Sequence, residues 1–232
     1  MVWFDKSFTP IRSSLAVAAF EGVPLGAMLV REESGAFSKM PNKYAFLNTD
    51  VIRMHNGTID DISGNGEYAI GRWTNGLYYA NTSPQTLTSA DGIHYVVYQK
   101  LLLAADATNG RKLQCRLQNS TKPTSSNGVA APGTVSGTVT LDTRTLAFSF
   151  TLNLAVGADS ATIGPMTATL PASTTWWSLN STMLGSDKTS VALLPIGTDS
   201  ESPTLALGYT AQMPTVGYAN GVAIFKCDQV VL

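Results

Sequence analysis

The chain has 232 residues, of which 44% are hydrophobic and only 13% carry a charged side chain, and its formal net charge is −1. This length suits one large all-β domain or two smaller ones with a buried core, and the charged share is about half of the usual ~25%. The balanced charge excludes the basic surface of a nucleic-acid-binding protein, so we expect no nucleic-acid partner. A surface with so few charges must be built from Thr, Ser, Asn and Gly, which favours an extracytoplasmic β protein.

Residues 1–43 show no sustained periodicity and are assigned to an N-terminal extension or additional strands. Leu15–Phe20 could form a strand or a helix, and Ala27–Arg31 indicates a short strand. No run of about 18 apolar residues occurs in the sequence, so no membrane-spanning helix is predicted. The apolar run that ends before Glu21 is not typical of a signal peptide, so either the chain is cytosolic or, as we expect, a leader or upstream region has been removed.

Residues 44–232 are assigned to a β-barrel domain, because short apolar or alternating runs recur there with almost no helical pattern between them. Asn56-Gly57 favours a type I′ hairpin turn, and Ser63–Gly66 indicates a second turn. A spacing of roughly 8 to 15 residues between strands points to an antiparallel sandwich or an up-and-down barrel. Tyr44–Met54 could form a further strand, and Leu77–Ala80 is a brief apolar piece. Strands are expected at Glu67–Trp73, His94–Tyr98, Arg111–Gln118, Thr134–Leu154 (as a hairpin), Ala161–Leu170, Val191–Ile196, Thr204–Thr210 and Gly221–Lys226.

The hairpin Thr134–Leu154 gives the strongest strand signal in the chain. Its second arm alternates apolar side chains with small or polar ones over ten residues, a period of two that predicts a half-buried strand and excludes an amphipathic helix. The apolar members are Leu146, Phe148, Phe150, Leu152 and Leu154. Such a face needs a partner surface, so we expect a layered or closed β structure that hides it.

A series of short motifs, each weak alone, occurs in a characteristic order along residues 44–227. They are Gly71–Trp73, Gly92–Val97, Gly110–Leu117 followed by Pro123-Thr124, Leu194–Gly197, Ala206–Tyr209 and Gly221–Phe225. The series resembles the C-terminal β-barrel domain that follows a FecR-type domain in some Gram-negative envelope proteins. That domain is similar to the eight-stranded barrel of transferrin-binding-protein-like surface lipoproteins.

The resemblance implies an all-β fold: an antiparallel up-and-down β-barrel of about eight strands with extra N-terminal strands or loops. It also implies an extracytoplasmic location, in the periplasm or on the surface of a Gram-negative bacterium. The expected function is a non-enzymatic module that binds an envelope protein or a polymer, in contact with water rather than spanning the membrane. The resemblance supplies no catalytic residues.

Cys115 and Cys227 are the only cysteines, too few for a disulfide scaffold and without the spacing of a metal site. They could form one disulfide in an oxidising compartment, provided that their Cα atoms lie within about 7 Å. The favoured alternative is that they remain as small buried thiols.

Two candidate ligand-binding groups lie on expected strands. The Arg72-Trp73 pair could clamp a strand end and seal the mouth of the barrel, with the guanidinium stacked on the indole or paired with a carboxylate, or both residues could contact a ligand. His94 falls within a strand pattern, where a hydrogen-bonded structural histidine is favoured over a haem ligand.

Trp176 and Trp177 are consecutive, so in a strand only one of them can face the core. The other would be an exposed indole suited to a sugar ring or a protein partner, or the pair could lie in a loop over the barrel end. No nucleophile elbow, phosphate-binding loop or dinucleotide fingerprint occurs, so no enzyme is predicted. Two alternatives stay open: a lipocalin-like carrier of haem or another small apolar ligand, and an integral outer-membrane barrel.

Overall fold

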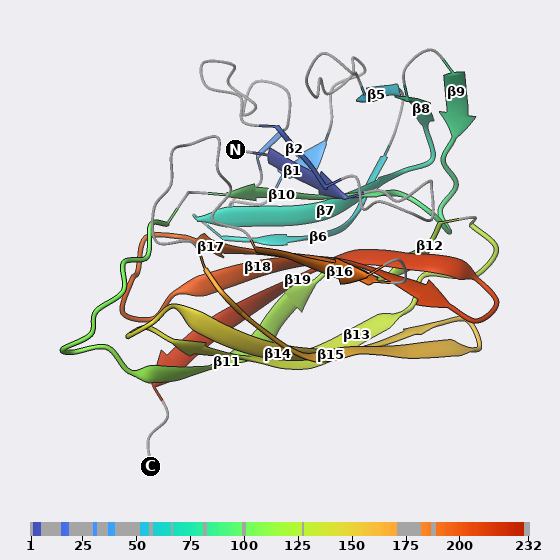
Figure 1. Ribbon diagram of the computed structural model, residues 1–232. Helices are drawn as coiled ribbons and strands as arrows, with labels where there is room; N and C mark the ends of the chain where they lie inside the picture. Colours follow the sequence, from blue (N-terminus) through green and yellow to red (C-terminus); the bar gives the residue numbers. More distant parts are fainter. Residues whose placement is uncertain are drawn as a thin grey trace.

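The computed structural model describes residues 2–5, 15–18, 30–31, 37–39, 52–55, 58–65, 67–80, 83–98, 101–126, 128–170, 182–186 and 189–229. Every regular element within these ranges is a β-strand, and every strand pairing is antiparallel. The predicted all-β antiparallel class is therefore confirmed. Figure 1 shows the strands arranged as a curled, half-barrel sheet with a second, smaller layer of strands lying across it.

The large sheet follows the order β15-β14-β13-β11-β19-β18-β17-β16, and the short β12 pairs with β19 beside this path. Two meanders, one of β11, β13, β14 and β15 and the other of β16, β17, β18 and β19, meet where β11 pairs with β19. The edge strands β15 and β16 are not joined by any pairing among the residues described. The strand bounds are β11 Lys112–Ser120, β12 Thr124–Ser125, β13 Thr134–Asp142, β14 Ala147–Val156, β15 Asp159–Thr169, β16 Thr182–Ser186, β17 Thr189–Ile196, β18 Thr204–Met213 and β19 Gly217–Gln229.

A five-stranded sheet, with the order β2-β1-β10-β7-β6, forms the second layer. Two small sheets, β3-β4 and β5-β8-β9, accompany it. The bounds are β1 Val2–Asp5, β2 Leu15–Ala18, β3 Val30–Arg31, β4 Phe37–Lys39, β5 Ile52–His55, β6 Thr58–Gly64, β7 Tyr68–Thr74, β8 Leu77–Ala80, β9 Ser83–Thr86 and β10 Ile93–Tyr98. Residues 44–111, which the sequence assigned to the barrel, contribute no described strand to the large sheet.

The apolar stripe of the β13–β14 hairpin faces the inside of the curled sheet. Its five side chains (Leu146, Phe148, Phe150, Leu152 and Leu154) are each at most 2% exposed, as the alternation predicts. They pack with apolar side chains from the facing strands β17, β18 and β19 in one core. Apart from Asp142, the outward positions of β13, β14 and β15 hold mostly small uncharged residues, among them Thr134, Ser136, Thr138, Thr140, Asn153, Ser160, Thr162, Thr167 and Thr169.

Strands β17, β18 and β19 are buried on both faces. In β19, Phe225 points into the half-barrel, whereas Ile224 points toward the second layer, where it meets Ile70 of β7 and Val96 of β10. This second core explains why Val191–Ile196 is continuously apolar rather than alternating, since neither face of that strand meets water. The molecule thus has three layers: the five-stranded sheet, the β17–β19 wall and the β11–β15 wall.

Candidate functional site

The first predicted site residue, Arg72, is held between the layers and is only 3% exposed. Its Nε donates to Asp61 Oδ2 at 2.8 Å, and its Nη1 donates to the backbone oxygens of Ser89 and Asp91 at 2.9 and 2.8 Å. Asp61 has a φ of 54° at an irregularity between β6 and β7, which lets its carboxylate turn toward the guanidinium. Arg72 therefore lies in the five-stranded sheet rather than at a barrel mouth, and its contacts hold β6, β7 and the loop before β10 together.

His94 is paired with Arg72 in the register of β7 and β10 and is completely buried. Its Nδ1 and Nε2 each lie 2.8 Å from a threonine hydroxyl, those of Thr121 and Thr124 respectively. Thr121 in turn bonds to the backbone of Val222 in β19. The imidazole thus links the second layer to the large sheet, and it could bind haem iron only after giving up one of these hydrogen bonds.

The three tryptophans proposed for ligand contact are placed only in part. Trp73 occupies β7, paired in register with Ile59 of β6 and Ile93 of β10. Trp176 and Trp177 lie outside the described residues. Of the sequence-predicted binding residues, the structure brings Arg72, Trp73 and His94 together on two adjacent strands of the second layer.

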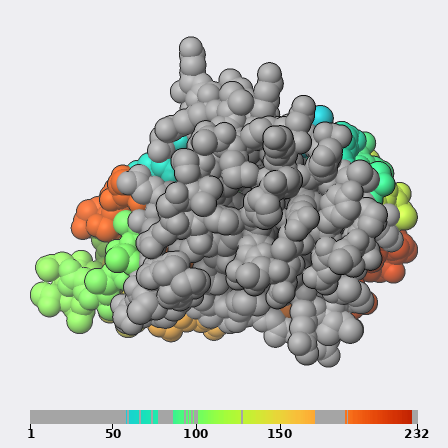
Figure 2. Space-filling model, turned by 90° about the horizontal axis from the view of Figure 1, so that it is seen from above, coloured from blue at the N-terminus to red at the C-terminus, as the bar shows by residue number. Residues whose placement is uncertain are grey.

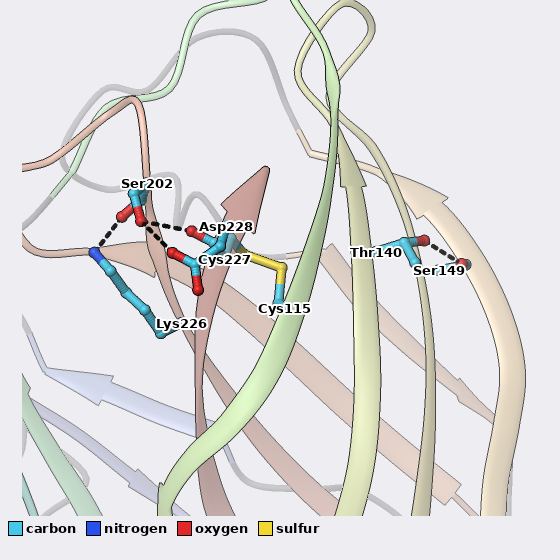
Figure 3. The surroundings of a disulfide bond; sticks show 7 residues. All are labelled: Cys115, Thr140, Ser149, Ser202, Lys226, Cys227 and Asp228. Carbon is cyan, nitrogen blue, oxygen red and sulfur yellow. Dashed lines mark hydrogen bonds between the residues drawn. A yellow bond between two sulfur atoms is a disulfide. The ribbon is translucent and has the colours of Figure 1, made fainter. Parts of the chain in front are cut away.

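Cys115 and Cys227 are joined by a disulfide, and their Cα atoms are 3.8 Å apart, within the required limit. They are direct cross-strand partners in β11 and β19, and both are completely buried. Figure 3 shows the bond between the two strands, with Ser202, Lys226 and Asp228 close by. The disulfide thus links β11 and β19, which are the first and the last strands of the large sheet along the chain.

A pocket of about 510 Å³ opens at the end of the half-barrel, where three connecting segments meet. These segments are the stretch before β11, the β13–β14 turn and the β17–β18 loop. Leu103 and Leu146 belong to the main core and also line the pocket, while Leu102 on its wall is 60% exposed. The pocket volume lies within the usual range for small-ligand sites, roughly 300 to 1,000 Å³.

Charged and polar groups surround this pocket. Arg111 Nη2 lies 2.7 Å from Glu201 Oε2 in an exposed ion pair. The backbone N–H groups of Thr108 and Asn109 donate to the Asp106 carboxylate, and these bonds lower the pKa of Asp106. We define the charged end by the charged residues Arg111, Glu201 and Asp106 together with their neighbours Lys112, Asp142, Arg144, Asp199, Lys226 and Asp228.

The charged end was not predicted from the sequence, because it gathers short segments that are distant along the chain. Hydrogen bonds fix the stretch before β11 to the β13–β14 turn: Asp106 N donates to Thr143 O, and Arg111 N donates to Thr143 Oγ1. A Cβ on Gly110 would lie 2.2 Å from the backbone carbonyl oxygen of Asp106 and 2.7 Å from Arg144 Cγ, so only glycine allows this close approach. The Asn109-Gly110 dipeptide is the one local signal of the turn.

Comparison with known proteins adds no relative. No family model, curated protein or solved structure matches this chain. Among the residues described, no helical segment is long and apolar enough to cross a membrane. Over the same part of the chain, no group of three or more His, Cys, Asp or Glu side chains is placed to hold a metal ion.

Proposed function

We propose that this chain is a non-enzymatic β-barrel module of the Gram-negative cell envelope, outside the cytoplasm, that binds an envelope protein or a polymer. The observation that carries the proposal is the buried disulfide between Cys115 and Cys227. Disulfides persist in the periplasm and at cell surfaces and are rare in the cytosol. The low charge content and the ordered motif series that resembles FecR-associated barrels support the same location.

Binding at an outer surface is favoured over transport of a small ligand inside the barrel. The inner face is lined with packed apolar side chains, including Phe148, Phe150 and Phe225, all at most 2% exposed. Apart from Asp142, the outward residues of β13–β15 are mostly small and uncharged, which suits a wall in contact with water, whereas a barrel embedded in lipid needs apolar side chains there. Trp176 and Trp177, which lie outside the described residues, are the side chains proposed to contact the envelope partner.

The location is tested by thiol trapping in the native bacterium. Cells are quenched in acid, free thiols are blocked, and the protein is reduced and labelled with a mass-shifting maleimide. We expect both cysteines to label only after reduction and the protein to be found in the envelope fraction. Labelling of both thiols before reduction, in the cytosolic fraction, would overturn the proposed location.

The binding role is tested by capture of purified envelope material, including isolated peptidoglycan and outer-membrane protein fractions, on the immobilised protein. Trp176→Ala and Trp177→Ala each remove one indole proposed for contact. Val129→Ala, which truncates an exposed residue in the loop before β13, serves as the control. We expect specific capture that one of the tryptophan variants loses and the control retains. Failure of the unmodified protein to retain any fraction would contradict a binding role.

The haem-carrier alternative makes an opposite prediction. Because both ring nitrogens of His94 already have hydroxyl partners in the core, we expect haem titration to give no Soret shift that depends on this residue. A Soret band that appears with the unmodified protein and is abolished in His94→Ala would favour the carrier instead.

A further inference from the structure

The charged end projects from the rest of the molecule. Figure 1 shows the green segment that leads into β11 extending beyond the sheets at the left, and Figure 2 shows the same green segment as a lobe at the side of the molecule. Leu102 lies in this segment, directly beside the pocket, with 60% of its surface exposed. Among the described residues, three large apolar side chains are exposed (Ile62, Leu102 and Val129), and of these Leu102 alone lines the pocket.

The same surface therefore carries both a projecting apolar side chain and a recess able to receive one. The recess has an apolar floor at Leu103 and Leu146, which are 9% and 1% exposed, and a volume of about 510 Å³. A leucine side chain entering it would lose its water contact against these two residues. In an interface formed by one patch facing a copy of itself, the pocket and the residue that fills it must belong to the same patch, as this pocket and Leu102 do.

The charges at this end also match a copy of the same surface. The charged end as defined holds four basic and five acidic side chains, which nearly balance, and it contains the ion pairs Arg111–Glu201, Arg144–Asp142 and Lys226–Asp199. Such a mosaic offers no net field to attract a strongly acidic or strongly basic partner. After a half-turn about an axis through the patch, however, the cations of one copy can face the carboxylates of the other.

We propose that this protein forms a two-fold symmetric dimer through the charged end, in which Leu102 of each copy occupies the pocket of the other. The exposed pair of Arg111 and Glu201 exchanges partners across the axis at little cost, because exposed ion pairs contribute only about 0 to 1 kcal/mol. The interface lies away from the outward face of β13–β15, so a dimer leaves that face open.

Sedimentation velocity over a wide range of protein concentration tests the proposal. We expect a monomer–dimer equilibrium for the unmodified protein and a dissociation constant roughly a hundredfold higher for Leu102→Ser, because each symmetric interface contains the substitution twice and each copy contributes about tenfold. Val129→Ser is the matched control: it also removes an exposed apolar side chain, 67% exposed, but in the loop before β13 at the other end of the half-barrel. It should dimerise like the unmodified protein.

Charge reversal provides an independent measurement. Arg111→Glu and Glu201→Arg should each weaken the dimer, and the protein carrying both substitutions should recover most of the lost affinity, because the opposite charges again face each other. Melting temperatures of all variants show that each is folded. A protein that is monomeric at every concentration, or a dimer that Leu102→Ser leaves unchanged, would overturn the proposal.

Discussion

At the scale of single residues, two kinds of polar contact must be separated. Arg72 and His94 are buried and fully engaged with groups of the same molecule, so their role is to hold the layers together. Arg144 pairs with Asp142 at an exposed turn, where water competes for both partners. The buried contacts should therefore affect stability far more than the exposed ones.

We expect Arg72→Ala to lower the free energy of unfolding by about 3 to 5 kcal/mol, because it leaves the nearly buried Asp61 carboxylate without its cation. Arg144→Ala, which breaks an exposed pair, should cost less than about 1 kcal/mol. Urea denaturation of both variants measures the difference. Equal losses would show that Arg72 is not the anchor inferred from its contacts.

Asp159 should make the end of the half-barrel opposite the charged end sensitive to acid. The backbone N–H of Thr215, and further bonds from Val216 and the Thr215 hydroxyl, lower the pKa of this carboxyl. A group whose pKa is lowered by folding stabilises the protein above its unfolded value of 3.8, and this contribution is lost as the pH falls through the folded pKa.

The corresponding variant is Asp159→Asn. We expect it to melt at a lower temperature at neutral pH and to lose less stability than the unmodified protein when the pH is lowered below about 4. Thermal melts over a pH series measure both effects. Curves that run parallel for the two proteins throughout the series would exclude Asp159 as a source of acid sensitivity.

At the scale of elements, the β13–β14 hairpin shows what local sequence can predict. The alternation of Leu146–Leu154 correctly indicated both the strand and its buried face, although Leu146 itself has a φ of 59° and belongs to the turn rather than the strand. The turn predicted at Asn56-Gly57 lies outside the described residues, and the strands on either side of it pair elsewhere: β5 with β8, and β6 with β7. A turn signal cannot reveal that more distant strands make better partners.

Within β14, an inward and an outward residue should differ sharply when truncated. Leu152 is completely buried, whereas its neighbour Asn153 is exposed on the other face. We expect Leu152→Ala to cost about 2 to 5 kcal/mol through lost packing and the remaining cavity, and Asn153→Ala to cost less than about 0.5 kcal/mol. Chemical denaturation compares the two, and similar values would contradict the assigned facing.

At the scale of the whole molecule, the three-layer arrangement could not be predicted because it depends on contacts between the N-terminal and C-terminal halves of the chain. The continuous apolar run Val191–Ile196 was a sign of a strand covered on both faces, but it does not identify the covering sheet. The pocket likewise requires the positions of three separate loops. The candidate site therefore could not be predicted from hydrophobic periodicity and short motifs.

Because β17–β19 are shared by both cores, we expect the two layers to unfold together. Ile224→Ala, on the side of the second layer, should cost about 2 to 5 kcal/mol, as large as a truncation inside the half-barrel. Unfolding followed by tryptophan fluorescence and by far-ultraviolet circular dichroism should give coincident transitions. Two separated transitions would indicate that the layers are independent.

The disulfide has a consequence for how the chain folds as it is made. Cys115 and Cys227 are separated by 112 positions, and β11 acquires its neighbour β19 only when that final strand has left the ribosome. Until then one edge of β11 has no partner strand, and an unpaired strand edge promotes aggregation unless a chaperone shields it. Oxidation of the two thiols can therefore serve as a chemical record that β19 has been made and has met β11 in register.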